Sequence, residues 1–328
     1  MGKSIVLAGS MIVDNVKMIS RWPDKGMLVP ISSSKRAVGG AVCNSGIDLK
    51  TLDPQVEVKA LGMVGDDDAG DFVISTLESK GLDCSLVTRA KGVPTSFTDV
   101  MTVESTGERT FFNMHGADSA LTPDDVDVSK LNCDIFHFGY LLLLDGMDAA
   151  DEEYGTKAAR LLAKVRAAGI KTSIDIVSEQ SERFARVVRP ALKYCDYVVI
   201  NEVEGSMATG VPADNMRGIC EGLFELGVSE QVVVHRPEMG ISMDKDGSFI
   251  QVPSLELPSG WIKGSVGAGD AFCAGVLYAL LKGFDAEYAL RLASCAAAMN
   301  LSSPDSIGGA RSLAETMELE KRFPRQSI

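Results

Sequence analysis

Short apolar runs rich in β-branched residues alternate along most of this chain with longer stretches of helical spacing. One such stretch runs from 154 to 168, with apolar residues on one face, and Gly169 follows it as a stop signal. This alternation predicts an α/β fold with a doubly wound, mainly parallel sheet flanked by helices, in which ligands bind at the carboxyl ends of the strands. The predicted strands lie near residues 5–8, 56–63, 135–138, 172–176, 197–200 and 232–234.

Composition limits the class of protein. The 328 residues are 45% hydrophobic, enough for a large core, and the net charge of −13 argues against nucleic acid or an anionic membrane as partner. Residues 1–9 fit a first strand rather than a signal peptide, and the longest apolar stretch, 271–281, is too short for a bilayer. The seven cysteines are scattered without a CxxC pair, which is typical of a reducing compartment, so we expect a cytoplasmic protein.

Two segments interrupt the alternation. Residues 94–116 fit two strands around the turn Ser105-Thr106-Gly107, and residues 11–36 fit two more around the turn signals at 22–26. We expect both excursions, within one domain spanning 1–328, to form a small β-subdomain that covers the active site as a lid; an ordinary extension of the sheet is the alternative. The tail, 311–328, is expected to begin as a helix and then fray.

The segment 264–270 reads Gly-Ser-Val-Gly-Ala-Gly-Asp and precedes an apolar, helix-compatible run. Glycines at GxxGxG spacing allow a sharp turn that exposes successive N–H groups, and the positive end of the helix faces the same place. The segment therefore predicts an anion cradle, with Asp270 in the first helical turn as a base beside it. A glycine-rich turn with a purely structural role remains the alternative.

Polar residues near two other turns fit a polyol ligand. Gly39 and Gly40 allow close approach to the backbone, Asn44 offers a donor and an acceptor, and Asp14 follows the first predicted strand, where a carboxylate accepts bonds from hydroxyls. A tight turn at a helix start and a solvated loop acid explain the same residues without a ligand.

Asn201 and Glu204 come directly after the strand at 197–200. An amide and an acid three residues apart share one face of a first helical turn, where they suit a hydrated divalent cation held through its waters. A capping box explains the same pair, and both interpretations are compatible.

Other chemistries find less support. The three histidines, at positions 115, 137 and 235, have no metal-site spacing, and His137 lies in an apolar strand as a core residue would. No GxxxxGK[ST] phosphate loop occurs. The segment 62–65, Gly-Met-Val-Gly, is an incomplete dinucleotide fingerprint followed by three acids rather than an obvious helix start, so an oxidoreductase is a weak alternative.

Taken in order, these motifs resemble the ribokinase-like (PfkB) carbohydrate kinase family over essentially the whole chain. The resemblance implies an ATP- and Mg²⁺-dependent kinase that phosphorylates a hydroxymethyl group of a sugar or nucleoside, with a β-lid that often forms a homodimer interface. It also implies roles for individual residues: Asp270 as catalytic base; the backbone of Gly267, Ala268 and Gly269 as anion hole; Asn201 and Glu204 as the magnesium and phosphate motif, with Glu204 acting through water; and Asp14, Gly39, Gly40 and Asn44 as the sugar-binding set.

The chain also departs from the family pattern. Gly264 and Ser265 stand where Asp-Thr is usual, so a side-chain contact associated with a monovalent cation or the nucleotide loop is missing and a K⁺ requirement stays open. The nucleotide segment reads Val-His-Arg-Pro-Glu-Met-Gly at 234–240, in which His235 and Gly240 are the candidate cofactor contacts. A sugar-binding relative with reduced turnover is therefore an alternative function.

We expect residues of the lid to determine which substrate is bound. Arg109, Phe111 and Phe112 follow the turn at 105–107, and their shape is expected to select the sugar or nucleoside. Arg109 is the candidate substrate contact among them.

Overall fold

A nine-stranded sheet runs through the computed structural model, which describes residues 3–179, 181 and 183–327. Seven neighbouring strands are parallel; β14 runs antiparallel to both of its neighbours, at one side of the sheet. In spatial order the strands are β15 (Phe249–Pro253), β14 (Met239–Asp244), β13 (Gln231–Arg236), β12 (Tyr197–Asn201), β11 (Lys171–Ile176), β8 (Ile135–Leu141), β1 (Ser4–Gly9), β4 (Glu57–Gly65) and β5 (Asp83–Ala90).

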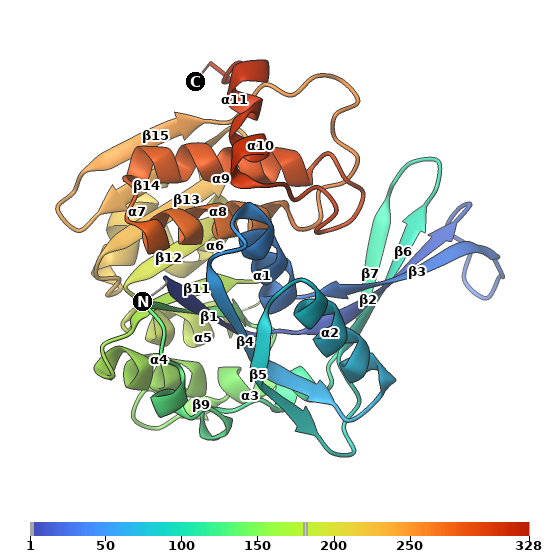
Figure 1. Cartoon of the computed structure of the whole chain (residues 1–328), viewed down its shortest axis with the longest axis horizontal. Coiled ribbons are helices and arrows are strands. Elements are labelled where there is room, and N and C mark those ends of the chain that lie inside the picture. Colours follow the sequence, from blue (N-terminus) through green and yellow to red (C-terminus); the bar gives the residue numbers. More distant parts are fainter. Residues whose placement is uncertain (1–2, 180, 182, 328) are drawn as a thin grey trace.

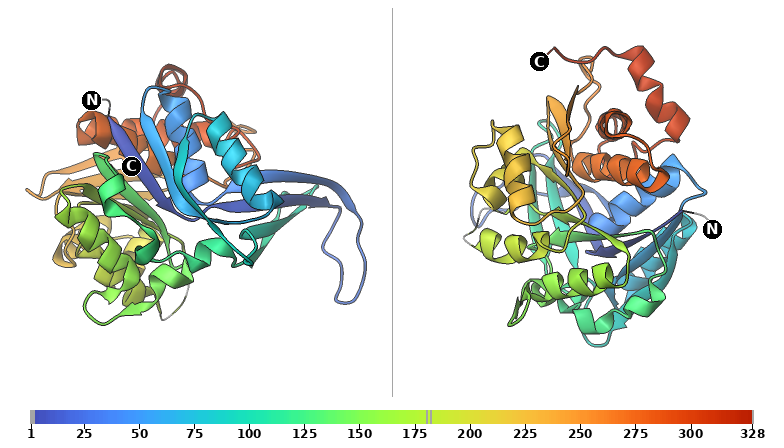
Figure 2. Two further views of the ribbon diagram at one scale, coloured as in Figure 1. Left: turned by 60° about the horizontal axis from the view of Figure 1, so that its bottom comes forward. Right: turned by 90° about the vertical axis from the view of Figure 1, so that its left-hand side faces the viewer.

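Helices cover both faces of this sheet, as Figure 1 and the right-hand view of Figure 2 show. One face carries α1 (Ala41–Leu52), α2 (Asp68–Ser79), α8 (Ala268–Lys282) and α9 (Ala286–Asn300), followed by α10 (Leu313–Met317) and α11 (Leu319–Arg322). The other carries α3 (Asp145–Asp148), α4 (Lys157–Ala167), α5 (Arg183–Leu192), α6 (Glu202–Thr209) and α7 (Met216–Glu225). The predicted doubly wound α/β class is confirmed. Among the described residues, no helix combines the length and apolar character needed to cross a membrane.

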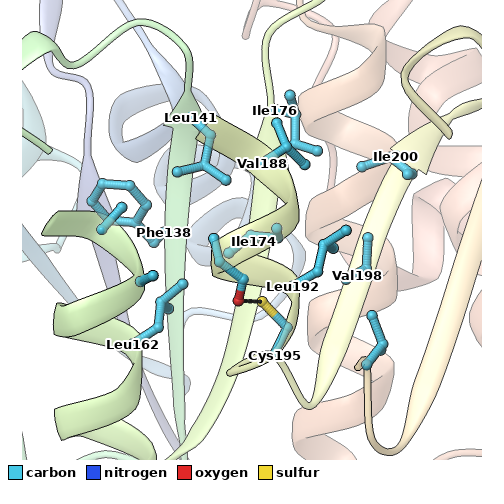
Figure 3. Packing of buried hydrophobic residues seen from close by; sticks show 14 of the residues in the cluster. Phe138, Leu141, Leu162, Ile174, Ile176, Val188, Leu192, Cys195, Val198 and Ile200 are labelled. Carbon is cyan, nitrogen blue, oxygen red and sulfur yellow. Dashed lines mark hydrogen bonds between the residues drawn. The ribbon is translucent and has the colours of Figure 1, made fainter. Parts of the chain in front are cut away.

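The apolar stripe predicted for 154–168 faces the sheet in α4. Leu162 is fully buried and lies with Val188 and Leu192 of α5 over Phe138 and Ile174 of the strands (Figure 3). The helix begins later than predicted, at Lys157, because Thr156 caps it by accepting a hydrogen bond from Ala159 N at 3.1 Å.

The two interrupting segments combine into one separate four-stranded sheet. Its order is β3 (Ile31–Gly39), β2 (Ile12–Ile19), β6 (Phe97–Val103) and β7 (Arg109–Met114), and β2 pairs in parallel with β6. This lid sheet projects from the main body in Figure 1 and in the left-hand view of Figure 2. Each half leaves the carboxyl end of a main-sheet strand, β1 or β5, so the lid sheet starts at the edge where ligands are expected.

The acids after the partial dinucleotide fingerprint do begin a helix, contrary to the sequence expectation. Asp67 caps α2 by accepting from Gly70 N at 2.8 Å, and Asp68 lies in the first turn, where acids are favoured. The glycines of the fingerprint have packing roles: a Cβ at Gly62 would lie 2.5 Å from Met11 Sδ, and one at Gly65 would lie 2.5 Å from Thr95 N.

The tail packs onto the protein instead of fraying. Leu319 is completely buried with Leu255 and Cys295, and the Arg325 guanidinium donates to Ser294 Oγ at 3.0 Å and to the carbonyl of Pro253. The polar composition of this segment reflects ion pairs with the protein rather than a solvated end. Residue 328 lies outside the described residues, as do residues 1 and 2 of the predicted first strand.

Core packing leads to a stability prediction. Leu162→Ala is expected to lower the free energy of unfolding by about 2–5 kcal/mol, because it removes buried methyl groups and leaves a cavity. Leu28→Ala is the matched control: Leu28 is 88% exposed, and its loss should change stability by less than about 0.5 kcal/mol. Urea unfolding of both variants checks this, and equal losses would contradict the assigned core.

Candidate active site

A cavity of about 490 Å³ opens at the carboxyl ends of β8, β11, β12 and β13, against the start of α8. Parallel strands bring these ends to one edge of the sheet. The chain passes from β1 to β4 on one side and later returns to β8 on the other, so the cavity adjoins a topological switch point. Its lining is Phe111, Tyr140, Asp175, Ile176, Val177, Ser178, Val199, Asn201, Glu204, His235, Val266, Gly269, Asp270 and Cys273.

Asp270 lies in the first turn of α8, and its side chain is held from two sides. Asn44 Nδ2 donates to Oδ2 at 3.0 Å, and the Tyr140 hydroxyl donates to Oδ1. Burial raises the pKa of the Asp270 carboxyl, and the hydrogen bonds from Tyr140 and Asn44 oppose that rise. The carboxylate is therefore a stronger base than a solvated aspartate, and its orientation is fixed.

The glycine segment forms a left-handed turn into α8. Gly267 is the N-cap with φ +81°, and a Cβ there would lie 2.4 Å from the carbonyl oxygen of Ser306. A Cβ at Gly269 would meet no atom within 4 Å. Among the described residues, the amides of Gly269 and Asp270 have no hydrogen-bond acceptor, so the start of α8 offers free donors at its positive end.

Two further carboxyl groups face the cavity. Glu204 is buried; its Oε2 accepts from Asn201 N at 3.0 Å, its Oε1 accepts from Ser178 Oγ at 2.6 Å, and Asn201 Oδ1 accepts from Glu204 N at 2.9 Å. The capping box is thus present at the cavity wall. Burial raises the pKa of Glu204 to about 7 and holds that of Asp175 well above its usual range, where the charges of Glu204 and Asp270 add to the effect.

The predicted sugar-binding residues surround Asp270 on the lid side, outside the lining of this cavity. A Cβ at Gly39 would lie 2.3 Å from Asp14 Oδ2, and one at Gly40, where φ is +87°, would lie 2.6 Å from the Ser10 carbonyl oxygen. Burial and the Asp270 charge raise the pKa of Asp14 to about 6. Asn44, besides bonding Asp270, accepts from Ser306 Oγ at 3.1 Å, so both ends of its amide are occupied.

Only some of the candidate nucleotide-binding and lid residues line the cavity. His235 lines the cavity and stacks on Phe272 with ring centroids 4.5 Å apart; burial lowers its pKa to about 4, so the imidazole is neutral at pH 7. Gly240 lies instead in β14, where a Cβ would press on Phe272 at 3.0 Å. Arg109 donates to the Pro304 carbonyl at 2.6 Å and is not part of the cavity lining, whereas Phe111 is.

Three further residues of this cavity were not among those predicted from the sequence: Tyr140, Ser178 and Cys273. Tyr140 and Ser178 follow predicted strands, at the edge where ligands were expected, and that position is the signal that could have identified them. Cys273 gave no such signal. It follows Asp270 by three residues in α8, and only the packing of α8 beside β8 and β11 brings its side chain to the cavity.

Comparison with solved structures identifies the fold. The ribokinase of Arabidopsis thaliana, solved with ribose and ATP, superposes with a TM-score of 0.81 at 22% identity, covering 98% of this chain and 99% of that one. The ribokinase of Thermotoga maritima gives a TM-score of 0.80 at 18% identity, covering 98% and 100%. Both show that the ribokinase-like fold predicted from the motifs is present.

Sequence comparison gives the family. A 5-dehydro-2-deoxygluconokinase of Shouchella clausii is 27% identical over 300 residues, covering 88% of this chain and 87% of its own length. The family model described as pfkB family carbohydrate kinase matches residues 3–312. The resemblance read from the motifs is confirmed: the chain belongs to the pfkB family of carbohydrate kinases.

Proposed function

We propose that this protein transfers the terminal phosphoryl group of ATP to a hydroxymethyl group of a sugar or nucleoside. The observation that carries this proposal is the position of Asp270: a buried carboxylate of raised pKa, in the same helical turn as two amides without an acceptor. A base and an anion-binding helix start in one turn suit a reaction in which an alcohol is deprotonated while negative charge moves onto a phosphoryl group.

Each part of the site has a role in that reaction. Asp270 accepts the proton of the acceptor hydroxyl, and Asn44 and Tyr140 keep its carboxylate aimed into the cavity. The backbone of Gly267, Ala268 and Gly269 forms the anion hole: the free amide of Gly269, with that of Asp270, binds phosphoryl oxygens and stabilises the charge that develops on them, while the Ala268 amide donates to the Ser265 carbonyl at 3.4 Å in the absence of ligand.

The acids opposite α8 fit a hydrated magnesium ion. Both carboxylate oxygens of Glu204 already accept hydrogen bonds within the protein, which suits a contact through water rather than direct coordination. Magnesium bound there would neutralise phosphate charge. Asn201 and Glu204 would hold it, and its charge would offset the negative charges of Glu204 and Asp270, which add to burial in raising the pKa of Asp175.

The remaining assignments of the site belong to the same proposal. His235 contacts the nucleotide as a neutral imidazole, and Gly240 supports it indirectly, since both pack on Phe272. The sugar is bound by Asp14, Gly39, Gly40 and Asn44. The lid sheet covers this side of the site and pairs two copies of the chain into a homodimer. Arg109 contributes to the sugar side by holding the segment around Pro304. The proposed location is cytoplasmic, and the K⁺ requirement stays open.

One contact favours a second candidate function. The Tyr140 hydroxyl occupies a hydrogen-bonding position on the Asp270 carboxylate that an acceptor alcohol would need. A protein that keeps this contact would bind a sugar without turnover. Ligand-induced thermal stabilisation in a sugar panel, without nucleotide hydrolysis or phosphorylated product, would identify this case.

The proposed base is tested by Asp270→Asn. Its kcat is expected to fall at least ~10²-fold, because the amide cannot accept the proton, whereas the substrate still stabilises the protein against heat. Asp48→Asn is the matched control: Asp48 is also a buried helical aspartate but does not line the cavity, so its kcat should stay within about threefold. Near wild-type turnover in Asp270→Asn would remove the proposed base.

The anion hole is tested by two glycine substitutions. Gly267→Ala forces a side chain into a left-handed position against Ser306 and should lower the free energy of unfolding by at least about 1–2 kcal/mol. Gly269→Ala meets no protein atom and should change stability by less than about 1 kcal/mol. It should instead raise the Kd of ATP about tenfold, or about 1.4 kcal/mol, by crowding the phosphates.

Urea unfolding and calorimetric titration separate these two effects. Unchanged ATP affinity in Gly269→Ala would place the phosphates elsewhere. Loss of stability in Gly269→Ala comparable with that of Gly267→Ala would show that both glycines serve the backbone alone.

The pH profile tests the role of Tyr140. Asp270 acts as a base only when ionised, so kcat/KM is lost as pH falls through its raised pKa. Tyr140→Phe removes a hydrogen bond that stabilises the carboxylate, so this pKa should rise further and the acidic limb should move to higher pH. Glu204 and Asp14 titrate in both proteins and therefore do not produce the difference. Tyr154→Phe, far from the cavity, should leave the profile unchanged; a limb that stays in place in Tyr140→Phe would contradict the assignment.

A further inference from the structure

Behind the acids of the cavity, three side chains of different chemistry meet. His137 on β8, Asp175 on β11 and Cys273 on α8 are all buried, and each brings one possible ligand atom within 4.8 Å of the others. Their segments are far apart in the sequence and are brought together by the pairing of β8 with β11 and the packing of α8 on that sheet. Asp175 and Cys273 line the cavity, so the cluster is in contact with it.

The histidine is oriented as a metal ligand would be. His137 Nδ1 forms a hydrogen bond with Ser173 Oγ at 3.0 Å, and its Nε2 faces Cys273 Sγ at 3.8 Å. A bond from the other ring nitrogen to a neighbouring oxygen fixes the tautomer and orientation of metal-binding imidazoles. Burial lowers the pKa of His137 to about 3, so its ring is neutral at pH 7. In the tautomer whose Nδ1 donates to Ser173 Oγ, Nε2 directs its lone pair toward Cys273 Sγ.

Gly139 borders the cluster. A Cβ at Gly139 would meet Ala41 Cβ first, at 2.9 Å, and would lie 3.3 Å from Asp175 Cβ and 3.7 Å from His137 Nε2. Zinc binds nitrogen at about 2.0–2.1 Å and sulfur at about 2.3 Å in a tetrahedron, and a nitrogen–sulfur separation near 3.8 Å is close to what such a pair requires.

We propose that His137, Asp175 and Cys273 bind a borderline-soft divalent ion of the Zn²⁺ class, with water from the cavity as fourth ligand. Imidazole, thiolate and carboxylate together select such an ion over Mg²⁺, which prefers oxygen ligands. This site is separate from the Asn201–Glu204 motif, which offers only oxygen and amide groups. Its existence does not depend on the proposed kinase reaction.

Binding is balanced by proton release. As the metal–sulfur bond forms, the thiol of Cys273 releases its proton to solvent; any proton that the Asp175 carboxyl carries leaves as the metal–oxygen bond forms, while His137 binds through its lone pair. The pKa values of both acids are raised by burial and by the charges of Asp270 and Glu204; Tyr140 and His235 also face the same cavity. Each proton that leaves offsets one positive charge of the ion that enters, and affinity should increase with pH.

The test is a Co²⁺ titration of the full chain without a histidine tag. We expect a near-ultraviolet thiolate-to-cobalt charge-transfer band with the visible bands of tetrahedral geometry, and displacement of both by Zn²⁺. Zn²⁺ should also raise the thermal transition of the protein, because it binds only the folded arrangement. Absence of the charge-transfer band in the wild-type protein would overturn the proposal.

Four variants define the site. Cys273→Ala should abolish the band, and Ser173→Ala, which removes only the partner of His137, should weaken Zn²⁺ affinity about 10–100-fold. Cys195→Ala is the matched control, since Cys195 is equally buried but its Sγ donates to the Ala191 carbonyl on the opposite face of the sheet (Figure 3). Glu204→Gln should leave Co²⁺ bound with its band intact.

The outcomes separate this site from its neighbours. A band that survives in Cys273→Ala, or that is lost in Cys195→Ala, would overturn the assignment. Loss of binding in Glu204→Gln as large as in Cys273→Ala would place the ion at the Asn201–Glu204 motif instead. Should Cys273→Ala fail to fold, the affinity of Ser173→Ala decides: wild-type binding there rejects the site.

Discussion

The parallel alignment of the central strands is the constraint on which the site depends. Parallel strands end at the same edge, so residues at their carboxyl ends become neighbours in space: Tyr140 in β8, Asp175 in β11, Asn201 in β12 and His235 in β13. A single antiparallel strand among these would send its polar end to the far edge. The antiparallel β14 lies outside this group. Its start reaches the same edge, where Gly240 pairs with His235, but a side chain at Gly240 would face Phe272 of α8 and Leu290 of α9 rather than the cavity.

The start of α8 is held by contacts from distant parts of the chain. Ser306 bonds Asn44 through its hydroxyl and closes over Gly267 with its carbonyl, while Asn44 in turn bonds Asp270. The base is thus fixed by α1 and by the loop after α9, not by its own helix alone. Gly269 lies between these supports but touches neither, which marks it as the position where the backbone is open to a ligand.

The sequence predicted the strands and the glycine turn well because each has a local signal: apolar runs, helical periodicity and residues that tolerate positive φ. It failed where the deciding contact is non-local. Neither the bond between Tyr140 and Asp270 nor the approach of Cys273 to His137, which are 136 positions apart, leaves a trace in local pattern. The acids after Gly65 were misread for a related reason, since they serve as the cap and first turn of α2.

The site contains several buried carboxyl groups, and their ionisation couples cation binding to the stability of the folded protein. Asp14, Asp175, Glu204 and Asp270 are all held at raised pKa values, chiefly by burial. Because burial disfavours an ionised carboxyl, ionising these groups opposes folding at pH values between their ordinary and their raised pKa values. A cation that replaces their protons removes that opposition. The sheet edge therefore combines a tendency to bind cations with helix-start amides that bind anions, and these are the two charge types that a metal–nucleotide complex presents.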